Sequence, residues 1–421
     1  MASTEETPNR AAEAQSLASI HRSAKNPNAG DAVALRIAVI QNASIREHMS
    51  LSTYLRNLLV ALASNSRIDI LALVSGGSSR DIGKSNVTVL SSGTSLYSIW
   101  GNIRYTCWCF RKLRKAARAA RISLVHCVDP ASSVTAALAF KLLVSPSTLV
   151  VYDLRGPWIE MAEYTGRFPR FLTSVMKGTL IAFEQLLTRR IDGVVFITDA
   201  LRRLYQMEYR CPVRKHEIAP SGVDLSLFKP KQKQHLRSML SIPDNLVVGG
   251  YVGAIANIRR LDFVISAIMS DRAQNLFLVM VGDGDSRQRL EAMAGGCSRI
   301  KFTGYIEPEE LPDIISGFDF GICHLPPARV FNVSFPLKVL EYAACDIPIV
   351  MSKMPAHVEI AKSVPQSALY VPSIESFLQA VERATKSPAG AARKSSEAFD
   401  WRATAKTLTS FYKSLYEARK T

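Results

Sequence analysis

The stretch Ser334-Phe-Pro-Leu-Lys-Val-Leu-Glu-Tyr-Ala-Ala-Cys-Asp-Ile-Pro-Ile-Val350 joins an amphipathic helix pattern to a short apolar run, and it decides the fold. Lys338 and Glu341 stand three residues apart, so they share one face of the helix. Residues 347–350 predict a short buried strand directly after it. A helix that leads at once into a buried strand is the repeating unit of an α/β protein.

The same stretch also suggests a binding site. A cation at a helix start suits phosphate groups, because the helix terminus carries positive charge, and a nearby carboxylate can accept hydrogen bonds from ribose hydroxyls. Lys338 and Glu341 therefore favour a nucleoside diphosphate as ligand. A surface ion pair on an ordinary helix is the plainer alternative.

Apolar runs alternate with helix patterns over most of the chain, which favours a doubly wound parallel sheet in each half. The predicted strands of the first half are residues 36–40, 68–74, 87–90, 124–127, 148–153 and 193–197. Those of the second half are residues 246–252, 277–281, 300–303, 318–323, 347–350 and 369–371. We expect an N-terminal Rossmann-like domain over residues 34–228 and a C-terminal one over residues 245–398, joined by a linker at 229–244.

Composition bounds the protein class. The chain has 421 residues, of which 48% are hydrophobic and 21% charged, as in soluble globular proteins. No apolar run reaches the roughly 20 residues that span a bilayer. Residues 1–33 lack the apolar core of a signal peptide, so we predict a disordered leader. Seven cysteines without a C-x-x-C pair indicate reduced thiols, no zinc site and the cytoplasm.

The net charge of +16 is concentrated in one helix pattern. Residues 104–121 hold seven Lys or Arg and no acid. At helical spacing one stripe combines basic residues with a tryptophan, namely Arg104, Trp108, Arg111, Lys115 and Arg118. A second stripe should face the core, namely Thr106, Phe110, Leu113, Ala117 and Ala120. The basic stripe predicts a surface for anionic lipid, with a solvated basic face as the alternative; no motif supports nucleic acid.

Two glycine turns follow predicted strands of the second half. Gly253 ends one strand, and Gly282 and Gly284 follow another, where glycine lets backbone N–H groups approach a phosphate or sugar. Arg259 and Arg260 come soon after Gly253 and could reach a diphosphate there. A tight strand-to-helix turn and a solvated arginine pair remain the alternatives.

The first half offers candidates for acceptor chemistry. Asp153, Arg155 and Glu160 share one loop after a buried strand, where the two acids could bind acceptor hydroxyls or act as a base. An ion pair with Arg155 that only orders the loop is equally consistent with this pattern. His126 ends a neighbouring strand and joins Arg155 and Glu160 in the predicted acceptor site.

Seven short motifs, taken together, resemble a known family. In order they are Phe-Ile-Thr-Asp-Ala-Leu (196–201), Pro-Ser-Gly-Val-Asp (220–224), Tyr-Val-Gly (251–253), Arg-Arg-Leu-Asp (259–262), Val-Gly-Asp-Gly (281–284), Phe-Thr-Gly (302–304) and Pro-Leu-Lys-Val-Leu-Glu-Tyr (336–342). This order resembles the GT-B-fold retaining glycosyltransferases of family four, in a Pro-x-Lys-x-x-Glu-Tyr variant. The resemblance covers residues 120–420 well and residues 35–120 in outline. It implies two Rossmann-like domains facing across a cleft, of which the first binds the acceptor and the second the nucleotide sugar, with a C-terminal helix, 399–421, that crosses back to the first domain.

The resemblance also implies roles for individual residues. Positions matching Arg259 and Lys338 clamp the donor diphosphate, and the position matching Glu341 holds the ribose. The turn Thr303-Gly304-Tyr305 flanks the base, and Ser334 completes the predicted donor-binding set. Asp153, Lys338 and Arg259 form the predicted catalytic set, with neither metal nor cofactor.

The chain departs from the family pattern at several positions. Val333 stands where the family has the first glutamate of its E-x7-E motif, and Asp346 replaces a glycine. Ala254 stands where an arginine often follows the glycine, and Tyr152 replaces a histidine. These departures affect donor identity and sugar positioning.

These inferences predict a cytoplasmic transferase, peripheral on the inner face of the cytoplasmic membrane. It would move a sugar from a nucleotide donor to a hydroxyl of a lipid-linked or cell-surface polysaccharide precursor, with retention. The alternatives are a nucleotide-sugar epimerase or hydrolase of the same fold, and a non-catalytic membrane-associated scaffold.

Overall fold

The structure is a computed structural model that describes residues 35–46, 50–94, 99–128, 131–165, 170–388 and 390–419. The predicted leader, residues 1–33, lies outside the described residues. The chain divides into two compact units. Unit 1 holds the residues up to Ile159, those from Gly166 to Ala219 and those from Thr404 onward, and unit 2 holds Glu160–Thr165 and Pro220–Ala403.

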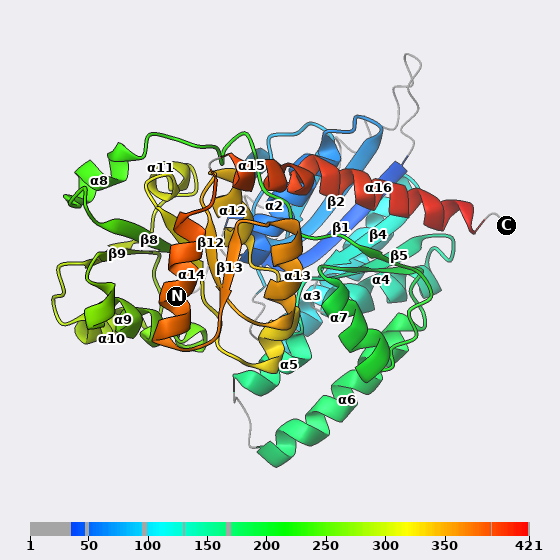
Figure 1. The fold of residues 1–421 in the computed structure, drawn as a ribbon. Helices are drawn as coiled ribbons and strands as arrows, with labels where there is room; N and C mark the ends of the chain where they lie inside the picture. The colour runs from blue at the N-terminus through cyan, green and yellow to red at the C-terminus, as the bar shows by residue number, and fades with distance from the viewer. Residues whose placement is uncertain are drawn as a thin grey trace, which may run out of the picture. The chain divides into compact units, whose positions relative to one another are not determined.

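Unit 1 contains a parallel sheet in the order β3-β2-β1-β4-β5-β6-β7 (Figure 1). Its strands are β1 (Leu35–Ser44), β2 (Ile68–Gly76), β3 (Val87–Ser91), β4 (Leu124–Val128), β5 (Leu149–Leu154), β6 (Gly193–Phe196) and β7 (His216–Ile218). Every residue of β4, β5 and β6 is buried. Strands covered on both faces read as continuous apolar runs, which is why the sequence revealed them. The short edge strand β7 has no such run, and the sequence analysis missed it.

The helices of unit 1 connect these strands. They are α2 (Ser50–Ala63), α3 (Ile99–Ala119), α4 (Ala131–Leu143), α6 (Arg170–Thr188) and α7 (Asp199–Arg203), together with most of α16 (Trp401–Glu417). A Cβ atom on Gly193 would come within 2.7 Å of the Phe411 ring and 3.0 Å of Leu415. The missing side chain therefore lets α16 pack directly on the first residue of β6.

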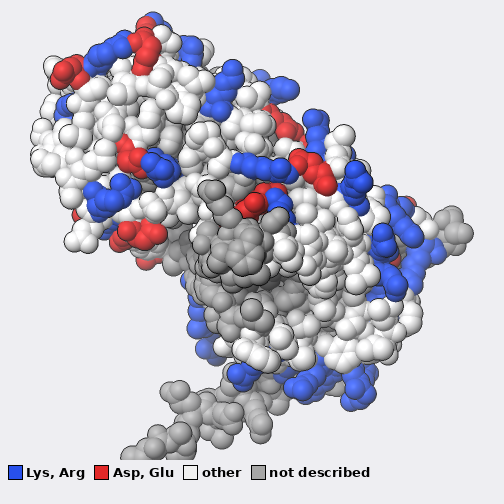
Figure 2. Space-filling view, turned by 90° about the horizontal axis from the view of Figure 1, so that it is seen from below, with Lys and Arg blue, Asp and Glu red and all other residues white. Residues whose placement is uncertain are grey.

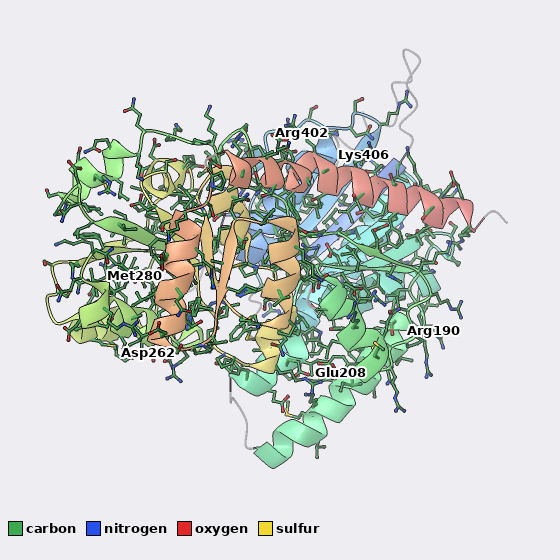
Figure 3. The ribbon with its side chains drawn as sticks, viewed as in Figure 1. Arg190, Glu208, Asp262, Met280, Arg402 and Lys406 are labelled. Carbon is green, nitrogen blue, oxygen red and sulfur yellow. The ribbon has the colours of Figure 1, made fainter. Side chains whose placement is uncertain are left out.

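Unit 2 contains a second parallel sheet in the order β10-β9-β8-β11-β12-β13. Its strands are β8 (Val247–Val252), β9 (Leu276–Val281), β10 (Ile300–Gly304), β11 (Phe320–Cys323), β12 (Ile349–Ser352) and β13 (Ser367–Tyr370). Alternate residues of β9 point into opposite hydrophobic clusters, as strand geometry requires. Val279 and Val281 join one cluster, whereas Leu278 and Met280 join the other; Figure 3 labels Met280.

Helices cover both faces of this sheet. The first cluster includes residues of α8 (Gln234–Leu240), α11 (Leu311–Ile315), α12 (Leu337–Ala344), α13 (Pro355–Ser363) and α15 (Ala391–Ser396). The second includes residues of α9 (Asp262–Met269), α10 (Arg287–Ala294) and α14 (Ile374–Thr385). The predicted pair of doubly wound Rossmann-like domains is thus confirmed.

The boundaries differ in detail from the sequence-based ones. The units divide at Ala219 and Pro220, earlier than residue 228, and α5 (Trp158–Tyr164) is shared between them. The segment 229–244 contains helix α8, whose Leu236 is fully buried against Gly317 in unit 2. A seven-residue helix between two prolines is too short to show a helical period, so the sequence pattern did not predict it.

Candidate functional site

The predicted donor residues gather at the topological switch point of unit 2. Strands β8 and β11 lie side by side in the centre of the sheet, and the chain turns in opposite directions after them. Open α/β sheets bind ligands outside the carboxyl ends of such strands. Gly253 follows β8 directly, whereas the 3-10 turn Arg329–Val333 and helix α12 come after β11.

The glycines at this edge serve two different purposes. Gly282 has φ +128°, and a Cβ atom there would lie 2.1 Å from the Gly253 carbonyl oxygen. A Cβ atom on Gly284 would lie 2.6 Å from the carbonyl oxygen of Ile255. These two glycines therefore let neighbouring turns pack backbone against backbone. Gly253 is different, because with φ +127° its Cβ position meets only the Lys338 side chain, with Nζ at 3.1 Å.

Lys338 lies in the first turn of α12 and is half-buried. Its ammonium group sits between Gly253 and the face of the Tyr251 ring, 3.5 Å from the ring centroid. No acidic side chain of the described residues forms an ion pair with it. The N-terminal end of α12 adds partial positive charge at the same place.

Glu341 follows one turn later on α12 and is also half-buried. Burial raises the pKa of its carboxyl group to about 7, although the positive charge of Lys338 lowers that pKa in part. At neutral pH the group is therefore divided between a proton donor and an acceptor. A ligand hydroxyl that donates a hydrogen bond would favour the ionised form.

The two arginines after Gly253 have separate environments. Arg259 ends the 3-10 turn Asn257–Arg259, and its guanidinium carbon lies 5.6 Å from the centroid of the Phe331 ring. Arg260 is exposed with φ +49° and binds Asp262 at 3.3 Å through two nitrogens. Figure 3 labels Asp262 at the start of α9.

Arg259 and Lys338 both act on the buried thiol of Cys323, the last residue of β11. Burial raises the pKa of Cys323 to about 11, and the positive charges of Lys338 and Arg259 both lower it in part. The structure thus brings these two predicted phosphate ligands to the end of β11, whereas Arg260 is engaged with Asp262.

The remaining predicted donor residues lie at the ends of β10 and of the turn before α12. Gly304, with φ +78°, accepts a hydrogen bond from the Gly282 amide at 2.8 Å, which ties the two turns together. The Thr303 hydroxyl donates to the Gly304 carbonyl at 3.0 Å. Tyr305 is 49% exposed, a surface on which a base could stack. Ser334, three residues before α12 begins, has its Oγ 3.5 Å from the Val330 carbonyl.

Tyr342 is a residue whose role the sequence analysis did not assign. Its hydroxyl accepts from the Val252 amide at 2.8 Å and lies 3.4 Å from the Ile322 carbonyl. Its ring also fills the space above Gly321, where a Cβ atom would come within 2.3 Å. Tyr342 therefore holds α12 at the ends of β8 and β11, one residue after Glu341.

Asp346, noted above as a departure from a glycine, has φ +63°, a conformation that favours glycine. Its carboxylate offsets this strain by accepting hydrogen bonds from the amides of Gly390, at 2.5 Å, and Arg393, at 3.2 Å. Asp346 therefore caps the start of α15, and its role in unit 2 is structural.

Two of the predicted acceptor-site residues, His126 and Arg155, meet the predicted catalytic residue Asp153 in the interior of unit 1. The carboxylate of Asp153 accepts from Tyr54 at 2.5 Å, from His126 Nε2 at 3.1 Å and from Arg155 at 3.1 Å. The other ring nitrogen of His126 lies 2.9 Å from the Tyr412 hydroxyl on α16. Burial tends to raise the pKa of Asp153, but the charge of Arg155 and these bonds hold it below its usual value.

This cluster is enclosed. Asp153, His126, Tyr54 and Tyr412 are at most 2% exposed, and Arg155 also donates to the Ala219 carbonyl at 2.9 Å. The ion pair that the sequence analysis left open is therefore present. The acceptor and catalytic roles of these residues stay predictions.

Glu160 is not part of that cluster. It belongs to unit 2, where its buried carboxylate lies 3.5 Å from the guanidinium of Arg329. Nearby, Tyr164 contacts the Phe331 ring edge to face, with centroids 5.4 Å apart. The predicted acceptor set is therefore divided between the two units.

Helix α3 carries the predicted basic surface. Arg104, Arg111, Lys115 and Arg118 are exposed, and Trp108 is half-buried and stacked on Tyr105 at 6.0 Å. The expected core stripe was wrong by about one residue, because the residues that α3 buries are Tyr105, Cys109, Leu113 and Ala116. The reason is that the Tyr105 hydroxyl reaches the Leu73 carbonyl at 2.5 Å and draws this face of the helix onto β2.

An open hollow of about 690 Å³ lies at the carboxyl-terminal ends of α3 and α4. Three arginines line it together with apolar side chains, namely Arg114, Arg118, Arg121, Phe110, Ile122, Leu143 and Val144. No acid of the described residues pairs with these arginines. The right-hand part of Figure 2 shows Lys and Arg with few Asp or Glu among them. In the described part of the chain, no helix is both long and apolar enough to cross a bilayer.

Two family models match the chain. Residues 51–227 match Glycosyltransferase Family 4, and residues 247–387 match Glycosyl transferases group 1. A D-inositol 3-phosphate glycosyltransferase of Stackebrandtia nassauensis is 27% identical over 186 residues, which is 41% of each chain. The putative teichuronic acid biosynthesis glycosyltransferase TuaH of Bacillus subtilis is 24% identical over 218 residues, 51% of this chain and 52% of that protein. The chain thus spans about half the length of the curated relatives it matches.

Solved structures share the fold at low sequence identity. Sucrose-phosphate synthase from Thermosynechococcus elongatus has a TM-score of 0.73 at 16% identity, over 91% of this chain and 100% of that one. HepE of Anabaena, solved with UDP and glucose, has a TM-score of 0.69 at 14% identity, over 90% and 100%. The expected GT-B architecture is therefore confirmed. The first half of the chain thus resembles Glycosyltransferase Family 4 and the second half Glycosyl transferases group 1, in this order along the fold.

Proposed function

We propose that the protein transfers a sugar from a nucleoside-diphosphate sugar to a hydroxyl acceptor, with retention and without a metal ion. The observation that carries the proposal is a pair of cations without an acidic partner among the described residues, Lys338 beside Gly253 and Arg259 over the Phe331 ring. Glu341 stands one turn from Lys338, where it can accept hydrogen bonds from ribose hydroxyls.

The mechanism follows from charge. As the bond to the sugar breaks, the departing nucleoside diphosphate gains negative charge. Lys338, Arg259 and the start of α12 stabilise that charge in place, which lowers the barrier and does the work that a metal ion does elsewhere. The matches of both halves to glycosyltransferase family models support sugar transfer over the reaction of an epimerase or hydrolase, and over a scaffold without activity.

Turnover of a nucleotide sugar tests the donor site. UDP-, GDP-, ADP- and dTDP-sugars are screened first by thermal shift, since a ligand of the folded state raises the melting temperature. Lys338→Ala should then lower turnover of the active donor about a hundredfold or more, with the fold intact by circular dichroism. Lys362→Ala, an exposed lysine on α13, is the matched control. Turnover that survives Lys338→Ala would show that the diphosphate site is elsewhere.

Two further measurements test retention of the anomeric configuration and independence of a metal ion. NMR of the product should show the donor's anomeric configuration, and chelation with EDTA should leave the rate unchanged. Product formed without acceptor would indicate the hydrolase or epimerase. Failure of all four nucleotide sugars to bind would favour the scaffold.

We further propose that the acceptor is a lipid-linked or cell-surface polysaccharide precursor and that the enzyme works on the inner face of the cytoplasmic membrane. The exposed basic side chains Arg104, Arg111, Lys115 and Arg118 of α3 and the arginine-lined hollow at its end support an anionic surface as partner. Exposed apolar side chains next to the hollow, Leu142 and Leu143, add an interfacial contribution.

Vesicle co-sedimentation tests the membrane surface. The wild-type protein should bind vesicles that contain phosphatidylglycerol more strongly than neutral ones, and added salt should weaken this binding. Reversing Arg111 and Lys115 to Glu should abolish it, whereas reversing Lys406 and Lys413 on α16 changes the net charge equally and should not. Equal binding to neutral and anionic vesicles would exclude the proposal.

A further inference from the structure

Each of the two cations of the predicted donor site lies over an aromatic ring. The Lys338 ammonium lies 3.5 Å from the centroid of the Tyr251 ring, and the Arg259 guanidinium carbon lies 5.6 Å from that of Phe331. Both distances fall within the range of a cation–π contact, which is about 6 Å. Each predicted phosphate ligand thus rests on the face of an aromatic ring.

Neighbouring arginines of unit 2 have acidic partners instead. Arg260 pairs with Asp262 at 3.3 Å, and Arg287 pairs with Glu291 at 2.8 Å. Lys338 and Arg259, by contrast, form no ion pair with an acid of the described residues. The aromatic support therefore distinguishes the two cations that point to a diphosphate from those that serve the surface.

The distinction matters because a carboxylate and an aromatic ring hold a cation in different ways. A carboxylate neutralises the cation and competes with phosphate for its hydrogen-bond donors. An aromatic face attracts the cation through its quadrupole and adds no net charge. A cation on a ring is therefore fixed in position while its full charge stays available to a ligand.

Both rings are themselves held firmly. Tyr251 is fully buried, and its hydroxyl donates to the Ala254 carbonyl at 3.0 Å, in the turn that begins at Gly253. Phe331 is 1% exposed and packs in a cluster with Leu325, Val330 and Met354. Tyr251 consequently fixes the Lys338 ammonium and the glycine turn through the same side chain.

We propose that Tyr251 and Phe331 are positioning residues that present Lys338 and Arg259 to the donor diphosphate as charged groups not held in an ion pair by any acid of the described residues. This inference rests on the proposed function, because it assumes that the diphosphate binds at Lys338. It predicts that the rings contribute to affinity for the diphosphate and not to affinity for the nucleoside.

Calorimetry with UDP, GDP, ADP and dTDP, and with the four matching nucleosides, tests the inference. Tyr251→Phe keeps the ring and should change affinity for the bound diphosphate less than about threefold. Tyr251→Leu should weaken it about three- to thirtyfold, the range of a cation–π contact, and leave nucleoside affinity unchanged. Phe331→Leu should act in the same direction through Arg259.

A double variant shows whether the ring acts through the cation. Lys338→Met should itself abolish most of the affinity for the diphosphate. Adding Tyr251→Leu to Lys338→Met should cause no further loss, because the interaction is already gone. Additive losses would mean that Tyr251 acts in another way.

A fluorinated series guards against a folding defect, since Tyr251 is part of the core. Phenylalanine with one, two or three ring fluorines at position 251 keeps the shape while weakening the quadrupole, so diphosphate affinity should fall with each fluorine. A flat series, or equal losses for nucleoside and diphosphate, would overturn the inference and leave the proposed function standing. Undiminished diphosphate affinity in Lys338→Met would instead overturn the proposed function.

Discussion

Glu184 on α6 offers a test of how burial controls charge in unit 1. Its Oε1 accepts from Trp158 Nε1 at 2.8 Å and from the Tyr152 hydroxyl at 3.1 Å, while its buried Oε2 has no partner. Burial raises the pKa of the carboxyl group to about 7, although the two hydrogen bonds lower it in part. We therefore predict that the free energy of unfolding of unit 1 falls as the pH rises and Glu184 ionises, and that Glu184→Gln removes this fall.

The sign and size of this pH dependence follow from the linkage between proton binding and folding. Between the unfolded pKa of about 4.3 and the folded pKa near 7, the folded protein holds a proton that the unfolded chain releases. The stability contribution of Glu184 is thus largest in acid and is lost as the pH rises through this window. At 1.36 kcal/mol per pKa unit, the full loss amounts to about 4 kcal/mol, of which about 3 kcal/mol falls between pH 4.5 and 8. The glutamine amide oxygen can accept the same two hydrogen bonds but does not titrate.

Hydrogen exchange of β5 and α6 amides, measured by mass spectrometry from pH 4.5 to 8, reports the opening free energy of unit 1 alone. The difference between Glu184→Gln and wild type should shift by about 3 kcal/mol in favour of the variant across this range. His324 and His357, buried histidines whose pKa values are lowered to about 4, follow the opposite trend, but they lie in unit 2 and both proteins contain them. A difference that is constant with pH would refute the reasoning.

Three further changes test other contacts. Tyr412→Phe removes the hydroxyl beside His126 Nδ1, so unit 1 should lose about 1–3 kcal/mol in the exchange experiment; full retention of stability would contradict this. Gly253→Ala places a methyl group 3.1 Å from Lys338 Nζ at φ +127°, so affinity for the donor nucleotide should fall at least tenfold in calorimetry, and an unchanged affinity would argue against contact there. The affinity for the donor nucleotide should rise with pH through about 7, because Glu341 ionises there and can then accept hydrogen bonds from the ribose. In Glu341→Gln the affinity measured by calorimetry should not change with pH over this range.

The strands of the two parallel sheets could be predicted well, because strands covered on both faces appear in the sequence as uninterrupted apolar runs. β7 and α8 escaped notice for the opposite reason. One is a short edge strand without an apolar run, and the other spans seven residues between prolines. The shift of the buried stripe on α3 came from Tyr105, whose hydroxyl finds a partner far away in the chain. Periodicity alone does not contain that information.

For the candidate site, the charged residues could be predicted from the sequence, but the aromatic rings that lie beneath them could not. Lys338 and Arg259 stand out as basic residues beside glycine turns. Tyr251 and Phe331 read as ordinary core residues, because which ring lies beneath which cation depends on packing between elements far apart in the chain. The same holds for Asp153, whose neighbours come from several strands and helices.

The bond between His126 and Tyr412 joins residues 286 positions apart, and this separation bears on how the protein is made. During synthesis the strands of unit 1 emerge before residues 220–403, and the α16 residues that pack on Gly193 and His126 emerge only after them. Unit 2 can therefore complete its core on the ribosome while the core of unit 1 still lacks Phe411 and Leu415. Unit 1 depends on a segment that is translated after unit 2, and in that interval it is the unit more exposed to chaperones and proteases.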